Sequence, residues 1–325
     1  MTTQNDLDID VPQLVLDALK RTSDYISPTP LEYSRHLSDQ IEGDVWLKLD
    51  SMLPTSSFKY RGAVNKIMSL TDEELKKGTV AASSGNFALA ITEASKVRNH
   101  KVPVYVSEDM EPTRIQLLKN FGVDVVIHNG DALDTEREAI RVAEKEGRVL
   151  LHPFNDPVVI GGQGTCGYEI SKQCPDVDAV LYACGGGGLL AGGAGWLKHH
   201  NPEMQVYGVQ PENSPSMHDC FKAGKLFTMD TLPTIADTCA GSVDLDSITF
   251  GLCQRYVDDF LLLSEDEIAE AMRLLFYKHR LVVEGSGAVG VAAILKNKEL
   301  FKGKKVVAVV CGKNIDIEVY KKIVL

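Results

Sequence analysis

The stretch AVLYACGGGGLLAGGAGWL, residues 179–197, carries no charged residue and places four consecutive glycines, Gly185 to Gly188, near its middle. Its length would be enough to cross a lipid bilayer, but seven glycines would break a membrane-spanning helix. The apolar residues 179–183 instead predict a buried strand, and residues 189–199 predict a helix. The stretch therefore predicts a strand, a glycine loop and a helix, a unit from which α/β folds are built.

Apolar runs of strand length alternate with longer helical patterns along the rest of the chain. Such alternation is typical of parallel sheets covered by helices on both faces. We expect strands at residues 45–49, 79–82, 102–106, 123–127, 149–151, 179–183, 205–209 and 305–310. We expect helices at residues 11–26, 59–70, 87–97, 112–121, 132–146, 162–174, 189–199, 265–279 and 287–296.

The chain has 325 residues, of which 44% are hydrophobic, and this size favours two domains. Residues 79–147 read as one compact block of alternating strands and helices. We therefore expect a small domain at residues 52–150 and a large domain made of residues 1–51 and 151–325. A cleft between two domains is a common place for a cofactor and its substrate.

Composition excludes several classes of function. The net charge is −11 and no basic cluster is present, so we expect neither a nucleic-acid partner nor a membrane partner. The N-terminal residues 1–10 are polar and acidic, unlike a secretory signal. Seven cysteines without a C-x-x-C pair indicate reduced thiols in the cytoplasm rather than disulfides or a zinc site.

The four glycines are a candidate phosphate cradle. Between a strand and a helix, consecutive backbone N–H groups can bind a phosphate, and glycine removes the Cβ atoms that would keep it away. A dinucleotide-binding loop is the alternative, because it places G-x-G-x-x-G at such a turn and an acidic residue about 20 residues later. Glu203 and Glu212 lie in that neighbourhood, so spacing alone leaves both alternatives open.

A second motif, SSFKYRGA at residues 56–63, contains the candidate nucleophile Lys59. A lysine in a cleft can lose its proton and attack an aldehyde to form a Schiff base. Most lysines are exposed, so a solvated lysine at the start of a helix is the alternative. A lysine and a phosphate cradle together are what pyridoxal 5'-phosphate needs, because it is an aldehyde with a phosphate tail.

Four motifs occur in one order along the chain: residues 56–63, the loop Ser83-Ser84-Gly85-Asn86, residues 185–188, and Cys311-Gly312-Lys313-Asn314. This order resembles the threonine/serine dehydratase branch of the fold-type-II pyridoxal-phosphate enzymes, over about Leu16 to Asp316. The resemblance implies an α/β fold of two domains, similar to that of the tryptophan synthase β subunit. Each domain would contain an open, twisted, mostly parallel sheet flanked by helices.

The resemblance also implies roles for individual residues. Lys59 would bind the cofactor and move the substrate's α-proton, while Ser84 is a candidate acid or base on the opposite face. Cys311 would lie against the pyridine nitrogen, where a neutral thiol suits β-elimination. The catalytic candidates are Lys59 and Ser84; the substrate-binding candidates are Ser83, Ser84, Gly85 and Asn86; the cofactor-binding candidates are Phe58, Lys59, Asn86, Gly185, Gly186, Gly187, Gly188, Leu189, Glu284 and Cys311.

Some of these residues also have a purely structural interpretation. Residues 83–86 suit an ordinary helix N-cap, which is compatible with substrate binding. Cys311 has the alternative of a buried structural cysteine, a common environment for this residue type. Glu284 has the alternative of a surface salt bridge. All three alternatives remain open at the level of the sequence.

The chain departs from the family pattern near the substrate loop. Residues 87–89 are Phe, Ala and Leu where most dehydratases have His, a small residue and Gln, which makes serine a less favoured substrate. Phe154 matches dehydratases better than serine racemases. Gln210 and Ser216 stand where some relatives have carboxylates that bind a divalent cation. Even with Glu212 nearby, we expect no metal site.

We therefore expect a cytoplasmic, homo-oligomeric ammonia-lyase, a dimer or tetramer, that uses pyridoxal phosphate. It would convert a β-hydroxy amino acid such as L-threonine or L-serine into a 2-oxo acid and ammonia. Alternatives with the same fold are a serine- or aspartate-type racemase, a β-replacement enzyme, and a hydroxyaspartate or phenylserine dehydratase. A nicotinamide-dependent dehydrogenase and a non-catalytic ligand sensor are alternatives from other classes. The preferred substrate and activation by nucleotides or monovalent cations are not readable from the sequence.

Overall fold

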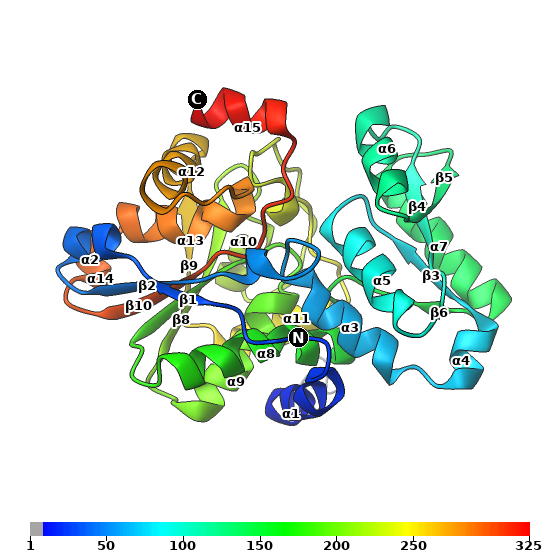
Figure 1. The fold of residues 1–325 in the computed structure, drawn as a ribbon, viewed down its shortest axis with the longest axis horizontal. Coiled ribbons are helices and arrows are strands. Elements are labelled where there is room, and N and C mark those ends of the chain that lie inside the picture. Colours follow the sequence, from blue (N-terminus) through cyan, green and yellow to red (C-terminus); the bar gives the residue numbers. More distant parts are fainter. Residues whose placement is uncertain (1–8) are drawn as a thin grey trace.

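The computed structural model describes residues 9–325 and contains two sheets (Figure 1). The acidic N-terminal segment considered above lies largely outside the described residues. In the larger sheet the strand order is β1 (Leu31–Tyr33), β2 (Asp44–Lys48), β10 (Lys305–Val309), β7 (Ala179–Ala183), β8 (Gln205–Pro211) and β9 (Asp259–Leu263). In the smaller sheet the order is β5 (Asp124–His128), β4 (Pro103–Ser107), β3 (Thr79–Ala82) and β6 (Val149–Leu150).

Neighbouring strands in both sheets are parallel, except for the antiparallel pair β1–β2 at one edge of the larger sheet. The central strand β7 is buried along its whole length, as expected for a parallel strand covered on both faces. The expected α/β class with two mostly parallel sheets is confirmed.

Helices cover both faces of the larger sheet (Figure 1). One side carries α1 (Val11–Thr22), α8 (Pro157–Gln173), α9 (Gly188–His200) and α11 (Ile248–Tyr256). The other side carries α12 (Glu265–His279), α13 (Gly285–Lys296) and α15 (Ile317–Val324). The shorter elements at its edges are α2 (Arg35–Ile41), α10 (Ser216–Ala223), α14 (Lys298–Phe301) and the 3-10 turns η2 (Asp50–Met52) and η3 (Asp237–Cys239).

The smaller sheet has its own helices (Figure 1). They are α4 (Asp72–Lys77), α5 (Asn86–Lys96), α6 (Pro112–Asn120) and α7 (Ala132–Glu146). Helix α3 (Lys59–Ser69) packs against α5 of this group and also against α8 of the larger one. Helix α3 therefore packs against helices of both halves of the fold.

Every strand expected from the sequence is present within a few residues, but β1 and β9 were missed. Strand β1 has three residues, too few to show alternation, and β9 lies at an edge of the sheet. The first helix ends at Thr22 rather than residue 26. Helix α8 begins five residues earlier than expected because Asp156 caps it, accepting hydrogen bonds from the N–H groups of Val158 (2.7 Å) and Val159 (3.2 Å).

The apolar stretch 179–197 forms β7, the glycine loop and most of α9. No helix among residues 9–325 is both long enough and apolar enough to cross a membrane.

Glycines let α8 approach its neighbours closely. A Cβ atom on Gly162 would lie 2.7 Å from the Cα atom of Gly62 in α3. A Cβ atom on Gly192 of α9 would lie 2.8 Å from the backbone nitrogen of Gly164 and would also collide with the carbonyl oxygen of Ile160. These contacts are with backbone, which cannot rotate away as a side chain can.

We therefore expect Gly192→Ala to lower the free energy of unfolding by about 1–3 kcal/mol, because α8 and α9 must move apart. Urea unfolding of the purified protein would measure the change. Gly290→Ala in α13 is the matched control, since its nearest neighbour would be the Cβ atom of Ala308 at 3.2 Å. Equal effects of the two substitutions would contradict this account of the helix contact.

Candidate active site

Lys59 begins α3 directly after a segment that is attached to the end of β10. The N–H of Phe58 donates to the carbonyl oxygen of Cys311 at 2.8 Å, and the N–H of Lys313 donates to that of Ser56 at 3.0 Å. Ser57 pairs with Gly312 in an isolated antiparallel bridge between these hydrogen bonds. Two stretches about 250 residues apart in the chain are thus held side by side, which brings Lys59 close to Cys311.

The Lys59 amine lies in a partly buried setting between aromatic rings. Its Nζ atom donates to the carbonyl oxygen of Pro153 at 2.9 Å and lies 5.1 Å from the ring centre of Phe58 and 5.9 Å from that of Phe87. Burial lowers the pKa of Lys59 to about 8, against the opposing effects of Cys311, Cys239 and Glu284. A substantial fraction of the amine is therefore neutral near pH 8, the form that attacks an aldehyde.

The four glycines connect β7 to α9 and are confined by neighbouring residues. A Cβ atom on Gly186 would collide with the ring of Phe154, and one on Gly185 would lie 2.9 Å from the carbonyl oxygen of Thr238. Gly187 has φ +84°, a left-handed conformation that glycine adopts without strain. Any larger residue would collide with the protein atoms that surround the loop. The backbone can therefore keep this tight conformation only with glycine at these positions.

The same loop has the electrostatics of an anion site. Helix α9 begins at Gly188, so the N–H groups of its first turn have no acceptor within the helix. They lie at the positive end of the helix dipole, where a phosphate is stabilised. The side chain of Leu189 is buried in the core, so it is the backbone of this residue that is available to an anion.

Asn86 belongs to a buried polar cluster that connects the start of α5, beside the smaller sheet, to the start of α13, beside the larger sheet. Its Nδ2 donates to both carboxylate oxygens of Glu284, at 2.9 and 3.2 Å. Asn314 donates through Nδ2 to Asn86 Oδ1 at 2.7 Å and through its backbone N–H to Glu284 at 3.0 Å. The amide of Asn86 is therefore fixed in one orientation by partners at the ends of α13 and β10.

Glu284 is 2% exposed, and its carboxylate is hydrogen-bonded by Asn86, Asn314 and Thr238. Burial raises its pKa to about 7, with a further increase from the neighbouring charge of Asp237. No lysine or arginine among residues 9–325 forms a salt bridge with it. The alternative of a surface salt bridge for Glu284 is wrong.

Cys311 is 1% exposed, and its Sγ donates to the carbonyl oxygen of Ser286 at 3.3 Å. Burial raises the pKa of this thiol well above its ordinary value, and the nearby charge of Glu284 raises it further. Cys311 is therefore a neutral thiol at physiological pH, the form that the sequence interpretation requires.

The loop at residues 83–86 caps α5. Ser83 Oγ accepts a hydrogen bond from the N–H of Ala88 at 3.2 Å, and Gly85 is the N-cap position. The carbonyl oxygen of Ser84 accepts from Arg114 Nε at 2.8 Å. The structure thus bears out the capping interpretation, which leaves substrate binding open.

Several residues around this site had no signal in the sequence. Arg114, in α6, reaches from Ser84 toward Asp237, with 3.4 Å between Nη1 and Oδ2. Thr238 Oγ1 lies 3.3 Å from Glu284, and Thr249 Oγ1 donates to the carbonyl oxygen of Gly186 at 2.7 Å. These side chains come from loops and helix ends without periodicity, so only their position in space identifies them.

His152, Glu136 and Asp244 form a cluster beside the site that has the composition of a metal centre. His152 Nδ1 accepts a hydrogen bond from the N–H of Asn155 at 2.8 Å, so in the neutral ring Nε2 carries the proton. Nε2 lies 3.7 Å from Glu136 and 3.5 Å from Asp244. A protonated Nε2 has no lone pair for a metal, and it faces the two carboxylates as a donor, so we assign no metal to this cluster.

The two positions considered for a divalent cation are engaged in local hydrogen bonds. Gln210 Oε1 accepts from the N–H of His218 at 2.7 Å, and Ser216 Oγ donates to the carbonyl oxygen of Gly241 at 2.6 Å.

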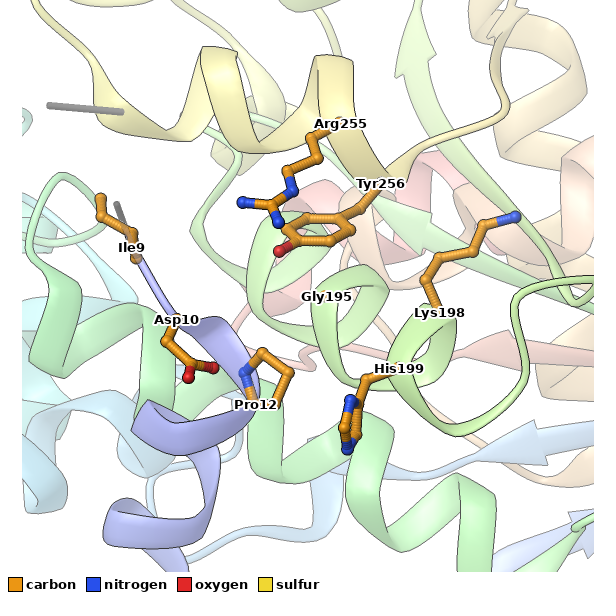
Figure 2. A pocket seen from close by; sticks show the side chains of 8 residues that line it. All are labelled: Ile9, Asp10, Pro12, Gly195, Lys198, His199, Arg255 and Tyr256. Carbon is orange, nitrogen blue, oxygen red and sulfur yellow. The ribbon is translucent and has the colours of Figure 1, made fainter. Parts of the chain in front are cut away.

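A separate hollow of about 520 Å³ lies between α1, α9 and α11, on the face of the larger sheet that these helices cover (Figure 2). Two of its polar residues have structural partners: Asp10 caps α1, and Lys198 pairs with Asp258 at 2.8 Å. None of the catalytic or cofactor-binding candidates lines it. We therefore place no part of the chemistry there.

The residues around Lys59 fit pyridoxal phosphate. Lys59 is an amine with a lowered pKa, the glycine loop leads into the free N–H groups at the start of α9 and has no room for Cβ atoms, and Cys311 is a neutral polar group close to Lys59. Together they supply a covalent attachment point, a phosphate site and a partner for a ring nitrogen.

Comparison with known proteins gives the same picture. A family model described as "Pyridoxal-phosphate dependent enzyme" matches residues 22–312. The L-threonine ammonia-lyase of Thermotoga maritima is 40% identical over 310 residues, 95% of this chain and 77% of that protein. The catabolic L-threonine dehydratase of Escherichia coli is 37% identical over 305 residues, 93% and 92% of the two chains.

Solved structures agree. The processed threonine deaminase isoform 2 of Solanum lycopersicum superposes with a TM-score of 0.90 at 31% identity, covering 97% of this chain and 93% of that one. Maize serine racemase superposes with a TM-score of 0.88 at 29% identity, covering 95% and 96%.

The lowered pKa of Lys59 has a measurable consequence. We expect the rate at which the cofactor-free protein captures pyridoxal phosphate to rise with pH through about 8 and then level off, because only the neutral amine attacks. Stopped-flow absorbance at a series of pH values would follow the capture.

Glu284→Gln would move the midpoint of this profile to lower pH, since the Glu284 charge favours the protonated amine. Lys59→Ala gives the background from other lysines. A rate that kept climbing to about 10.5, the ordinary lysine value, would contradict the proposed environment of Lys59.

Proposed function

Because this chain belongs to the pyridoxal-phosphate dependent enzymes, we propose that it is an ammonia-lyase that converts L-threonine into a 2-oxo acid and ammonia. The cofactor is pyridoxal phosphate. The observation that carries the proposal is the amine of Lys59, whose pKa is lowered to about 8 and which donates to Pro153, next to the Phe154 ring that packs on the glycine loop. Threonine is chosen because relatives that are 40% and 37% identical over more than nine-tenths of this chain are named as threonine enzymes, whereas racemase structures are 29%, 33% and 27% identical.

Family membership replaces the dinucleotide-binding interpretation of the glycine loop. We assign the phosphate to the backbone of Gly185 to Gly188 and the first turn of α9, and the ring nitrogen to Cys311. Asn86, oriented by Glu284, would donate to the ring oxygen, and Phe58 would pack against the ring.

The reaction divides into tasks for particular residues. When bound, pyridoxal phosphate withdraws electrons from the substrate's α-carbon and so makes loss of the α-proton easier. Lys59 binds the cofactor before the substrate arrives and then takes the α-proton. Ser83 and Asn86, with the N–H groups at the start of α5, hold the substrate carboxylate. The β-hydroxyl leaves as water, and a water molecule later replaces the amino group, releasing ammonia.

Ser84 has two possible tasks in this scheme. We assign it to carboxylate binding, together with Ser83, because its backbone is held by Arg114. Proton transfer by its hydroxyl would place a second acid or base opposite Lys59, which belongs to the racemase alternative.

The site is apolar on the side of α5. Phe87 is 2% exposed and its ring centre lies 5.9 Å from the Lys59 amine, and Leu89 is buried in the same core. An apolar neighbour favours the extra methyl group of threonine over the smaller serine.

We also propose that the protein is a cytoplasmic homo-oligomer. All seven cysteines are free and buried, which suits a reducing compartment. The domain division proposed from the sequence, residues 52–150 against the remainder, is supported by the smaller sheet, whose strands all lie between residues 79 and 150.

The proposed activity is tested by incubating the purified protein, loaded with pyridoxal phosphate, with L- and D-forms of β-hydroxy amino acids. We expect 2-oxo acid and ammonia in equal amounts from L-threonine, and loss of both products in Lys59→Ala. Lys76→Ala, which removes an exposed lysine of α4, is the control and should keep full activity. Production of D-allothreonine from L-threonine, or of D-serine from L-serine, without ammonia would instead establish a racemase.

Substrate preference tests the role of Phe87. We expect kcat/KM to favour L-threonine over L-serine, and Phe87→His to reduce this ratio about tenfold, because a polar ring replaces an apolar one beside the substrate. Phe87→Leu keeps an apolar side chain and is expected to retain the preference. An unchanged ratio in Phe87→His would show that Phe87 does not contact the substrate.

A further inference from the structure

Arg61 follows Lys59 by two residues and is fully buried. Its guanidinium binds two carboxylates in bidentate fashion: Asp50 at 2.7 and 2.8 Å, and Glu169 at 2.6 and 2.9 Å. Nη1 also donates to Thr165 Oγ1 at 3.0 Å. With Thr29 Oγ1 at 3.3 Å from Nη2, every N–H of the guanidinium has an acceptor within reach.

A second cation completes the cluster. Lys48, also fully buried, pairs with Glu169 and donates to the carbonyl oxygen of Thr29 and to Gln173 Oε1, both at 2.8 Å. The cluster therefore contains two cations and two carboxylates. Burial by itself would raise the pKa of Asp50, but the Arg61 charge beside it holds that pKa below its ordinary value.

All the partners of Arg61 belong to elements that build the larger sheet and its helices. Asp50 lies in η2 just after β2, and Glu169 and Thr165 lie in α8. The contact thus attaches the first turn of α3 to the framework of the larger sheet.

Burying four charges is costly, and apolar residues of similar volume are often as stabilising or more so. Beyond stability, a bidentate guanidinium fixes the orientation of the groups that it joins. Its planar fork donates two hydrogen bonds to each carboxylate in only one geometry. The position of the cluster under the first turn of α3 therefore points to a role in orientation.

Side chains two residues apart on an α-helix point about 200° apart. Lys59 thus faces the Pro153 carbonyl and the Phe87 ring while Arg61 faces the opposite way into the framework. The Phe58–Cys311 hydrogen bond attaches the chain on the side of Lys59, and Arg61 attaches it on the other. A rotation of the first turn that displaced the Lys59 amine would break both guanidinium forks.

We propose that Arg61 is a positioning residue: its clamp on Asp50 and Glu169 sets the rotation of the first turn of α3 and thereby holds the Lys59 amine where it reacts. This inference rests on the proposed function for the role of Lys59. It concerns the geometry of the amine and not the binding of the substrate.

The test compares Arg61→Lys with Lys48→Met. Arg61→Lys keeps the charge but cannot form two forks, whereas Lys48→Met removes a cation from the same cluster without touching α3. We expect Arg61→Lys to slow covalent capture of pyridoxal phosphate by about tenfold or more, and to lower kcat for threonine similarly with KM within about twofold. Lys48→Met should leave both rates within about twofold of wild type while lowering the urea midpoint.

Two results would overturn the proposal. One is a capture rate and kcat in Arg61→Lys equal to those of wild type. The other is that Lys48→Met, at the same urea midpoint as Arg61→Lys, loses as much capture rate and kcat. Should Arg61→Lys fail to fold, Asp50→Asn removes one fork with little change in shape, and a capture rate equal to wild type there would overturn the proposal. Capture needs no substrate, so it still reports on Arg61 if the wild-type protein releases no ammonia, which would refute the proposed function alone.

Discussion

The site depends on keeping an amine out of water without giving it a carboxylate to pair with. Lys59 donates to a backbone carbonyl and lies beside two aromatic rings, and the loss of hydration is what lowers its pKa. The carboxyl group close by, Glu284, has its own pKa raised to about 7 and is hydrogen-bonded by amides and a hydroxyl. Had a charged carboxylate been placed against Lys59, the amine would stay protonated and unreactive.

Other buried cations in the fold, unlike Lys59, are paired with carboxylates. Arg61 and Lys48 are fully buried, yet each has its carboxylate at hydrogen-bonding distance. The contrast separates two cations within one helix turn: Arg61 is fully buried and paired with carboxylates, whereas Lys59 is partly buried with a carbonyl as its partner, the setting that the proposed chemistry needs. The lowered pKa of Lys59 also makes the folded state less stable at neutral pH, because the protonated amine is better solvated in the unfolded chain.

How much of this was predictable differs from residue to residue. The strand–loop–helix unit around Gly185 to Gly188 was visible because apolar runs and glycines are local signals. Asn86 and Cys311 were recognised as parts of motifs, but their burial and partners were not. Arg114 and Thr238 had no signal at all, because they reach the site from α6 and η3 only after the chain has folded. Helix α8 was expected too short, because the start signal of Asp156 as N-cap and Pro157 in the first turn was not recognised.

The attachment of residues 56–58 to residues 311–313 also bears on how the protein is made. Strand β10 lies between β2 and β7 in the larger sheet, although it follows every other strand of the described residues in sequence. A nascent chain can form the smaller sheet early, because β3 to β6 are contiguous in sequence. It cannot close the larger sheet or bring Cys311 to Lys59 until β10 and the residues after it have been synthesised. The growing polypeptide is thus unable to assemble this site prematurely, and its late-forming contacts are those of high sequence separation, which are typically slow to form.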